Sequence, residues 1–138
     1  MRTALDTNVI SEMMDAAPRA GAVAQALEVL REDGPLIICG VVYAELHAKA
    51  KASRALIDSF LGVTGVTLDP EMDTAIWAEA GRANADHHAR KRASGEHGVR
   101  PVLPDFLIGA HALHRADRLF TLNLTDFSDF PALTVVTL

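Results

Sequence analysis

The stretch Leu5-Asp6-Thr7-Asn8-Val9-Ile10-Ser11 decides the fold class that we predict for this chain. The residues that lead into it, Thr3 to Leu5, are typical of a short buried parallel strand, and Asp6 stands where that strand would end. Open α/β sheets bind ligands at the carboxyl ends of their strands, so a carboxylate here is well placed for chemistry. Asp6 could instead only cap the helix that follows, and other acids have to decide between these interpretations.

Short apolar segments alternate with helical patterns along the rest of the chain. Strands are expected at residues 3–5, 36–39, 66–68, 118–121 and 133–136, with helices between them. Parallel strands need crossover connections, so this alternation predicts an α/β fold with a mainly parallel sheet that helices cover on both faces. The chain has 138 residues and no internal repeat, and residues 1–138 are expected to form a single domain.

The start of one long helix has a clear local signal. Asp69-Pro70-Glu71 offers an N-cap, a proline at the first helical position and an acid in the first turn, so a helix is predicted to begin there. Its core stripe would consist of Met72, Ile76, Ala80 and Ala83. Trp77 is interpreted as a packing residue of the same helix, and a later helix is predicted to begin at Pro104-Asp105.

Composition excludes several classes of protein. Hydrophobic residues make up 49% and charged residues 22% of the chain, which is typical of an ordinary globular protein. No apolar run approaches the roughly 20 residues that span a bilayer, and no basic region followed by an apolar stretch opens the chain. We therefore expect no membrane association and a cytoplasmic location. The only cysteine, Cys39, lies in an apolar run and is expected to be a buried, unreactive thiol.

The distribution of charge matters more than its sum. A formal net charge of -5 argues against binding nucleic acid through overall basicity, because phosphate contacts need positive potential. Between Arg82 and Pro104, however, five basic residues minus two acidic ones leave +3. Within this segment Arg90, Lys91 and Arg92 could hold the phosphates of a nucleic acid, or could form only a solvated face.

Two further acids are candidates for the same sheet edge as Asp6. Glu45 lies in the mostly apolar helix expected after the second strand, where its carboxylate would lose hydration unless a cation pairs with it. Lys49, four residues on, could be that cation. Asp105 could be stabilised by the helix dipole alone, or could reach the carboxyl edge of the sheet if the preceding loop folds over.

Four segments carry a family resemblance, and they are Leu5–Ser11, Val41–Leu46, Pro104–Ala110 and Thr121–Phe127. Together, and in this order, they resemble the PIN-domain ribonucleases, and the whole chain is most similar to VapC-type toxins of bacterial toxin–antitoxin pairs. The resemblance implies a three-layer α/β/α fold with a mainly parallel sheet in the order 3-2-1-4-5. It also implies a cluster of carboxylates that holds Mg²⁺ or Mn²⁺ and cleaves RNA.

The resemblance assigns roles to individual residues. Asp6, Glu45 and Asp105 match the family acids and would be the catalytic metal ligands. The groups that would orient ligands or waters are Thr7, Asn8 and Thr121. The fourth acidic position of the family falls on Asn123, which is a departure, because an amide oxygen can ligate a hard cation but brings no negative charge.

Two interpretations of this fourth position remain. Either three carboxylates suffice with Asn123 as a neutral ligand, or Asp126 turns inward and supplies the missing charge. Leu124-Thr125-Asp126-Phe127 also reads as a turn in which Asp126 caps the backbone, and this is the interpretation we favour. We therefore predict that Asp126→Asn leaves most metal-dependent cleavage in place and that Asn123→Asp tightens metal binding.

General chemistry favours the same type of site. A divalent ion can lower the pKa of a nucleophilic water and neutralise charge that develops on a phosphodiester, and Mg²⁺ prefers oxygen ligands. The histidines lack companion cysteines or the tight spacing of a zinc site. No glycine-rich loop follows the first strand, which disfavours a nucleotide-binding fold, and Asn8 occupies the place where a haloacid-dehalogenase-like phosphatase would need a second acid.

Partners follow from the resemblance alone. It implies a VapB-type antitoxin that wraps the toxin and blocks the acidic cleft, an RNA substrate, and a homodimer. The competing interpretation is a non-catalytic PIN-like module that binds RNA or protein and whose metal site is weakened at Asn123. Metal-dependent cleavage of RNA by the purified protein would discriminate between these two functions.

Overall fold

The computed structural model describes residues 1–96, 98 and 100–138, and a five-stranded sheet in the order β3-β2-β1-β4-β5 forms its centre. The strands are β1 (Thr3–Leu5), β2 (Leu36–Cys39), β3 (Val66–Asp69), β4 (Arg118–Phe120) and β5 (Val135–Val136). Every neighbouring pair is parallel. The predicted α/β class and the strand order implied by the resemblance are confirmed.

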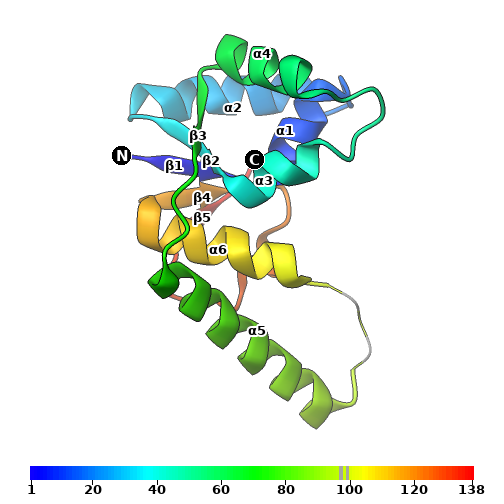
Figure 1. Ribbon diagram of the computed structural model, residues 1–138, viewed down its shortest axis with the longest axis vertical. Coiled ribbons are helices and arrows are strands. Elements are labelled where there is room, and N and C mark those ends of the chain that lie inside the picture. Colours follow the sequence, from blue (N-terminus) through cyan, green and yellow to red (C-terminus); the bar gives the residue numbers. More distant parts are fainter. Residues whose placement is uncertain (97, 99) are drawn as a thin grey trace.

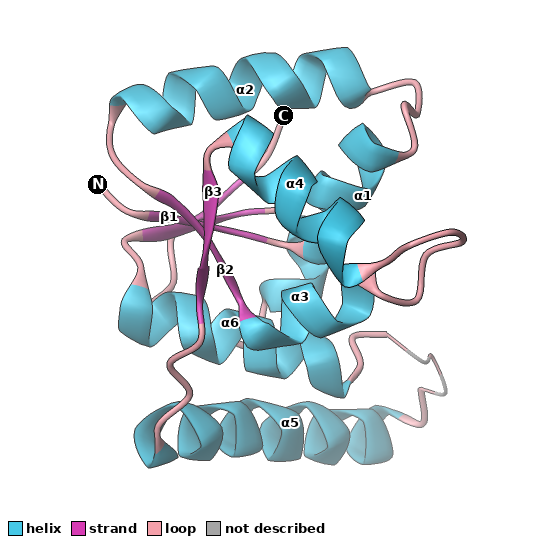
Figure 2. Cartoon of the chain, turned by 45° about the horizontal axis from the view of Figure 1, so that its top comes forward, coloured by secondary structure: helices cyan, strands magenta, loops and turns pink. Residues whose placement is uncertain are grey.

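Helices cover both faces of this sheet. They are α1 (Thr7–Met14), α2 (Ala20–Glu32), α3 (Gly40–Leu46), α4 (Arg54–Thr64), α5 (Thr74–Ser94) and α6 (Leu103–Arg115), with a short 3₁₀ helix η1 (Leu124–Phe127). Helices α2 and α4 lie on one side of the sheet and α6 on the other, and α5 packs along the outer side of α6 (Figures 1 and 2). The three-layer arrangement explains why every side chain of β1 and β2 is buried, as in other parallel sheets covered on both faces.

The register of the central strands brings three strand ends together. Ala4 of β1 pairs with Ile37 of β2 and with Leu119 of β4, so the carboxyl ends of these strands meet at one edge. The N–H of Asp6 donates to the carbonyl oxygen of Phe120 at 3.0 Å, which extends the β1–β4 pairing by one residue. Helices α1 and α3 begin at this edge, and α3 packs against α6.

The long helix α5 begins later than the sequence predicts. Strand β3 runs through Asp69, and Asp73 is the N-cap, whose carboxylate accepts the N–H of Ile76 at 3.0 Å. The predicted start at Asp69-Pro70-Glu71 is wrong because the carboxylate of Asp69 binds Arg115 and the N–H of Glu71 instead. Two aspartates with similar local signals compete here, and only the tertiary contacts separate them.

Trp77 is not the packing residue that we predict from the sequence. Its side chain is 52% exposed, and its indole N–H donates to the carbonyl oxygen of Met72 at 2.9 Å. Ile76, Ala80 and Ala83 of α5 are buried as predicted, but Met72 lies before the helix and is only partly buried. Cys39 is buried as expected, and no helix in the described part of the chain is long and apolar enough to cross a membrane.

Candidate functional site

A pocket of about 290 Å³ opens at the carboxyl edge of the sheet. Its lining residues come from α1, α3 and the start of α6, and they are Asp6, Thr7, Asn8, Ser11, Glu45, Arg100, Val102 and Asp105. The three predicted acids, which are far apart in the sequence, therefore line one pocket. We call it the acidic pocket.

Asp6 is both a helix cap and a pocket residue, so neither interpretation of the sequence excludes the other. Its Oδ1 accepts the N–H of Thr7 at 2.7 Å, which caps α1, and its Oδ2 accepts the hydroxyl of Thr121 at 2.7 Å. The pKa of Asp6 is raised to about 6: burial raises it most, the two hydrogen bonds lower it, and the nearby charges of Asp105 and Glu45 raise it. A bound cation would therefore stabilise the charged form of this buried carboxylate.

Glu45 is held by a hydroxyl and not by a lysine. Its Oε1 accepts the hydroxyl of Thr7 at 2.5 Å, which points the carboxylate toward Asp6. Lys49 instead pairs with Asp15 at 2.7 Å. The alternative in which Lys49 neutralises Glu45 is therefore wrong.

Asp105 reaches the acidic pocket from the first turn of α6. Its Oδ2 accepts the N–H of Val102 at 2.9 Å, so the carboxylate caps the helix while it faces the pocket. Burial raises the pKa of Asp105, and the charges of Asp126 and Glu45 add to this effect. Arg100 and Val102, which directly precede α6, line the same pocket, so this part of the chain reaches the carboxyl edge of the sheet.

The predicted orienting residues lie where they can act on the acids. Thr7 and Thr121 hold the carboxylates of Glu45 and Asp6, as described above. Asn8 bridges the ends of β1 and β4, because its Oδ1 accepts the N–H of Leu122 at 3.2 Å and its Nδ2 donates to the hydroxyl oxygen of Thr121 at 3.4 Å. These contacts fix the directions of two of the three acids.

Asn123 and Asp126 lie behind this pocket. The amide nitrogen of Asn123 donates to Asp126 at 3.0 Å, and its amide oxygen accepts the hydroxyl of Thr125 at 2.9 Å. Asp126 is buried and forms an ion pair with Arg100. The interpretation of Asp126 as a backbone cap is wrong, because its carboxylate is bonded to the side chains of Asn123 and Arg100.

Arg100 is the pocket residue that sequence reasoning missed. The sequence counts it only as one of five basic residues between Arg82 and Pro104. Its guanidinium binds Asp126 and lies 3.9 Å from the carboxylate of Asp105. No local pattern marks such a residue, because its partners follow it by five and 26 positions and meet it only in the folded chain.

The basic stretch on α5 is only partly free to meet RNA. Arg90 forms an ion pair with the buried Asp129, and Lys91 donates to the carbonyl oxygens of Gly98 and Arg100. Arg92 is exposed. A second pocket of about 440 Å³ beside this stretch is lined by His87, His88, Lys91, Arg92, Gly95, Glu96, Gly98 and Pro101.

The acidic pocket suits a hard divalent cation by its chemistry. Across residues 1–96, 98 and 100–138, no three His, Cys, Asp or Glu side chains lie close enough together to form a ready-made metal site. Mg²⁺, however, usually binds one or two carboxylates and keeps several waters. The acids of the pocket offer oxygen donors, and burial raises the pKa of Asp6 and of Asp105, so a bound cation would stabilise their charged forms. The donor set therefore fits Mg²⁺ or Mn²⁺.

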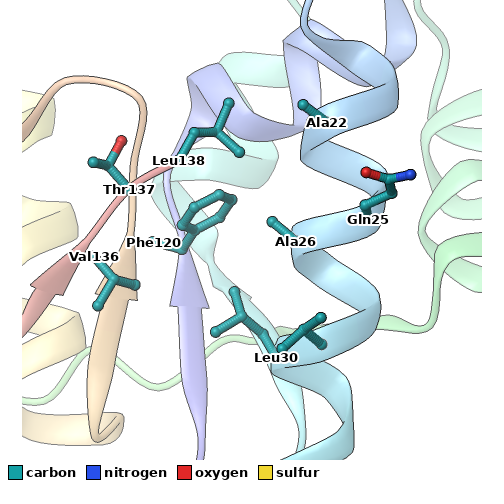
Figure 3. A pocket seen from close by; sticks show the side chains of 9 residues that line it. Ala22, Gln25, Ala26, Leu30, Phe120, Val136, Thr137 and Leu138 are labelled. Carbon is teal, nitrogen blue, oxygen red and sulfur yellow. The ribbon is translucent and has the colours of Figure 1, made fainter.

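A larger pocket elsewhere has a different character. It measures about 440 Å³ and lies between α2 and the C-terminal residues beside β4, as Figure 3 shows. Apolar side chains such as Ala26, Leu30, Phe120 and Leu138 line most of it, with Gln25 and Thr137 as the polar exceptions. It holds no carboxylate side chain, whereas three acids line the acidic pocket.

Comparison with known proteins agrees with this geometry. The family model described as the PIN domain matches residues 3–133. No match is found among curated proteins. Among solved structures, one chain of VapBC-1 from nontypeable Haemophilus influenzae is similar with a TM-score of 0.69 and 24% identity, over 99% of this chain and 98% of that one.

Two further structures show the same likeness. VapBC2 from Rickettsia felis, bound to a DNA fragment from its promoter, matches with a TM-score of 0.65 and 21% identity, over 99% of this chain and 98% of the other. DNA-bound VapBC from Salmonella typhimurium matches with a TM-score of 0.65 and 22% identity over the same shares. The resemblance to VapC-type PIN domains is thus confirmed for the fold.

Proposed function

We propose that this chain, which belongs to the PIN domain family, is a metal-dependent endoribonuclease that acts as the toxin of a toxin–antitoxin pair. One observation carries the proposal: Asp6, Glu45 and Asp105 line one pocket although they come from distant parts of the sequence. Like charges in one pocket repel one another, so such a cluster is costly unless it binds cations.

The residues of the pocket have separable tasks. Asp6, Glu45 and Asp105 would hold Mg²⁺ or Mn²⁺, which supplies a nucleophilic water of lowered pKa and offsets charge on the phosphodiester. Thr7 and Thr121 keep the carboxylates of Glu45 and Asp6 pointed into the pocket through their hydroxyl groups. Hydrogen bonds from neighbouring groups that fix metal ligands commonly contribute tenfold to 100-fold in metal affinity or activity.

The toxin role rests on the similar structures. They are VapBC complexes, and one further structure is described as a toxin–antitoxin complex from Klebsiella pneumoniae, with a TM-score of 0.59 and 22% identity. We extend this to a VapB-type antitoxin for the present chain, which would cover the acidic pocket with a basic side chain. A homodimer of the toxin belongs to the same proposal.

The decisive experiment is cleavage of an RNA panel by the purified protein with Mg²⁺, with Mn²⁺ and with EDTA. Asp6→Asn should lower the cleavage rate at least about 100-fold, since a bound metal supplies several kcal/mol of transition-state stabilisation. Asp86→Asn is the matched control, because it removes one negative charge from an exposed ion pair on α5. Cleavage that survives both EDTA and Asp6→Asn would refute the proposal.

A cellular test addresses the toxin role separately. Expression of the chain should arrest growth, and co-expression of the neighbouring reading frame should relieve the arrest. The Asp6→Asn variant should be harmless at the same protein level. Harmless expression of the active protein in several hosts would refute the toxin role without refuting the nuclease.

The basic stretch supports a proposal about where the RNA runs. Arg90, Lys91 and Arg92 would hold phosphates near the otherwise acidic site. Arg92 is exposed, whereas Arg90 is paired with Asp129 and Lys91 donates to backbone carbonyl oxygens. Neutralising all three should weaken RNA binding and flatten its salt dependence while metal binding persists. An unchanged salt dependence of RNA binding would show that the stretch is only a solvated face.

A non-catalytic binding module is the second candidate. It is favoured by the lack of a ready-made metal cluster within the described part of the chain and by Asn123, whose amide groups are both bonded to neighbours. This module would bind RNA without cutting it, whether Mg²⁺ or Mn²⁺ is present. Cleavage that requires Mg²⁺ or Mn²⁺ would exclude it.

A further inference from the structure

Arg100 stands out because it is the basic side chain that lines the acidic pocket. Its guanidinium forms an ion pair with Asp126 and lies 3.9 Å from Asp105, yet its side chain remains 56% exposed. An arginine that served only to neutralise buried acids would be expected to lie deeper. Arg100 therefore keeps part of its hydrogen-bonding capacity for something outside the protein.

A continuous set of hydrogen bonds holds this arginine in place. Asp126, which binds the guanidinium, is 3% exposed and also accepts the amide of Asn123 at 3.0 Å. The N–H of Asn123 donates to the hydroxyl oxygen of Thr121 at 3.0 Å, and Thr121 donates in turn to Asp6. The same framework thus fixes Asp6 and Arg100 on two sides of one pocket.

The donors of Arg100 exceed its partners. A guanidinium carries five N–H groups in a planar fork, and Asp126 is the one carboxylate within hydrogen-bonding distance of it in the described structure. The same fork matches a phosphate group in a two-point contact, which a lysine cannot reproduce. Because the other ionisable side chains of the pocket are acids, a polyanion needs such a contact there.

We propose that Arg100 receives a phosphate group of the bound RNA at the acidic pocket, and that Asp126 and Asn123 are positioning residues that hold it there. The inference rests on the proposed function and names a substrate-binding residue of that site. It also gives Asn123 a task other than metal binding. In the complex with metal and RNA, the family acids would bind the cation and Arg100 would bind the anionic RNA.

If the tasks are divided in this way, removing Arg100 should change the affinities for metal and for RNA in opposite directions. Without Arg100 the pocket becomes more negative, so a divalent cation should bind more tightly. RNA should bind more weakly, because a charged two-point contact is lost. General damage to the pocket would instead weaken both.

The experiment measures both affinities in the full chain. Mn²⁺ binding is followed by electron paramagnetic resonance, and binding of a labelled single-stranded RNA is followed by fluorescence anisotropy with EDTA. We expect Arg100→Ala to lower the Kd for Mn²⁺ by about threefold to tenfold and to raise the Kd for RNA by about tenfold. Arg100→Lys should restore the Mn²⁺ affinity but only part of the RNA affinity.

Arg54→Ala is the matched control, because Arg54 is 84% exposed on α4 and pairs with the exposed Asp58. It should change neither affinity. An unchanged Kd for RNA in Arg100→Ala, or a weaker affinity for Mn²⁺, would overturn the inference. If the unmodified protein binds Mn²⁺ and RNA but Arg100→Ala changes neither, only this inference fails. If the unmodified protein binds no Mn²⁺, both this inference and the proposed nuclease function fail.

The positioning role of Asp126 has its own test. Asp126→Ala should raise the KM for RNA about threefold to tenfold and leave kcat within about twofold, because Arg100 loses its anchor while the metal site persists. Asp126→Asn retains an oxygen that can accept the guanidinium and should keep most of the cleavage. A loss of kcat in folded Asp126→Asn would identify Asp126 as a metal ligand and overturn its positioning role.

Discussion

Two aspartates end strands on either side of β2, and the chain treats them differently. Asp6 follows β1, and Asp69 is the last residue of β3. Both side chains are buried at the carboxyl edge of the sheet. The pKa of Asp6 is raised to about 6, whereas the pKa of Asp69 is lowered below its usual value.

The difference comes from the partners at the two ends of α6. Burial raises the pKa of Asp69, but hydrogen bonds from Arg115 and Glu71 and the charge of His111 outweigh it. The guanidinium of Arg115 approaches Asp69 at 3.0 Å, and the ring of His111 at 3.1 Å. Asp105, at the opposite end of the same helix, brings a further negative charge to Asp6 instead.

A carboxylate at a strand end is therefore a ligand candidate only when the chain leaves it without a cation. Asp69 has its own cation, Arg115, and this ion pair joins the end of β3 to α6. Asp6 has only hydroxyl and N–H donors, which orient a carboxylate without neutralising it. The following predictions test this contrast.

The largest effect should be on catalysis. Asp105→Asn should lower metal-dependent RNA cleavage at least about 100-fold, because it removes one of the three carboxylates proposed to hold the metal. Asp69→Asn should keep the rate of the folded enzyme within about threefold. Initial rates at saturating Mg²⁺, with circular dichroism as a check on folding, measure both. Equal losses in the two variants would break the contrast.

The next effect should be on stability and should have the reverse pattern. Asp69→Ala leaves His111 and part of Arg115 without their partner, and should lower the free energy of unfolding by about 2 kcal/mol after allowance for the partial exposure of Arg115. Asp86→Ala, which breaks an exposed ion pair, should cost less than about 1 kcal/mol. Urea unfolding curves compare the two. A smaller loss in Asp69→Ala than in the control would show that this ion pair is not structural.

A smaller effect should follow from the hydroxyl that orients Asp6. Thr121→Val keeps the shape of a fully buried side chain but removes the donor to Asp6 Oδ2. We expect the affinity for Mn²⁺ to fall about tenfold, as for other hydrogen bonds to metal ligands. Thr125→Val, a change at an exposed hydroxyl on η1, serves as control. An unchanged affinity in Thr121→Val would mean that the backbone alone orients Asp6.

The smallest effect should be a pH-dependent gain in the stability of the metal-free protein when Asp6 is replaced by Asn. Because the folded pKa of Asp6 lies near 6 and its ordinary value is 3.8, the folded state binds the proton more readily than the unfolded state. Asp6 therefore destabilises the fold progressively as pH rises through about 4 to 6, and fully above that range. With EDTA at pH 7.5, Asp6→Asn should raise the free energy of unfolding by about 1 kcal/mol. This value already subtracts the loss of one of the two hydrogen bonds to Asp6, because an amide has one acceptor oxygen where a carboxylate has two.

The same gain should vanish at pH 4, where Asp6 is protonated in the folded protein. Saturating Mg²⁺ should stabilise the unmodified protein and not the variant. Urea unfolding at the two pH values, with and without Mg²⁺, checks each of these outcomes. A variant that is less stable than the unmodified protein at pH 7.5 with EDTA would show that Asp6 is not an uncompensated charge.

Local sequence determined much of the fold. The apolar run Leu36–Cys39 and the N-cap signal of Asp6 each specify their element through burial and hydrogen bonding within a few residues. The alternation of strands and helices then requires a parallel sheet, and this places Asp6 and Thr121 at one edge. Local signals marked Asp6 and Asp105 at element ends, but the family resemblance was needed to assign these two acids and Glu45 to one site.

Tertiary structure alone decided which cation each carboxylate meets. Lys49 lies four residues from Glu45 but binds Asp15, whereas Asp126 finds Arg100 across 26 positions. Charge pairing acts over a few ångströms in space, and no periodic pattern records it. For the same reason the sequence predicted the cap of α5 at Asp69 and not at Asp73, which is wrong because the side chain of Asp69 is engaged by Arg115 of α6.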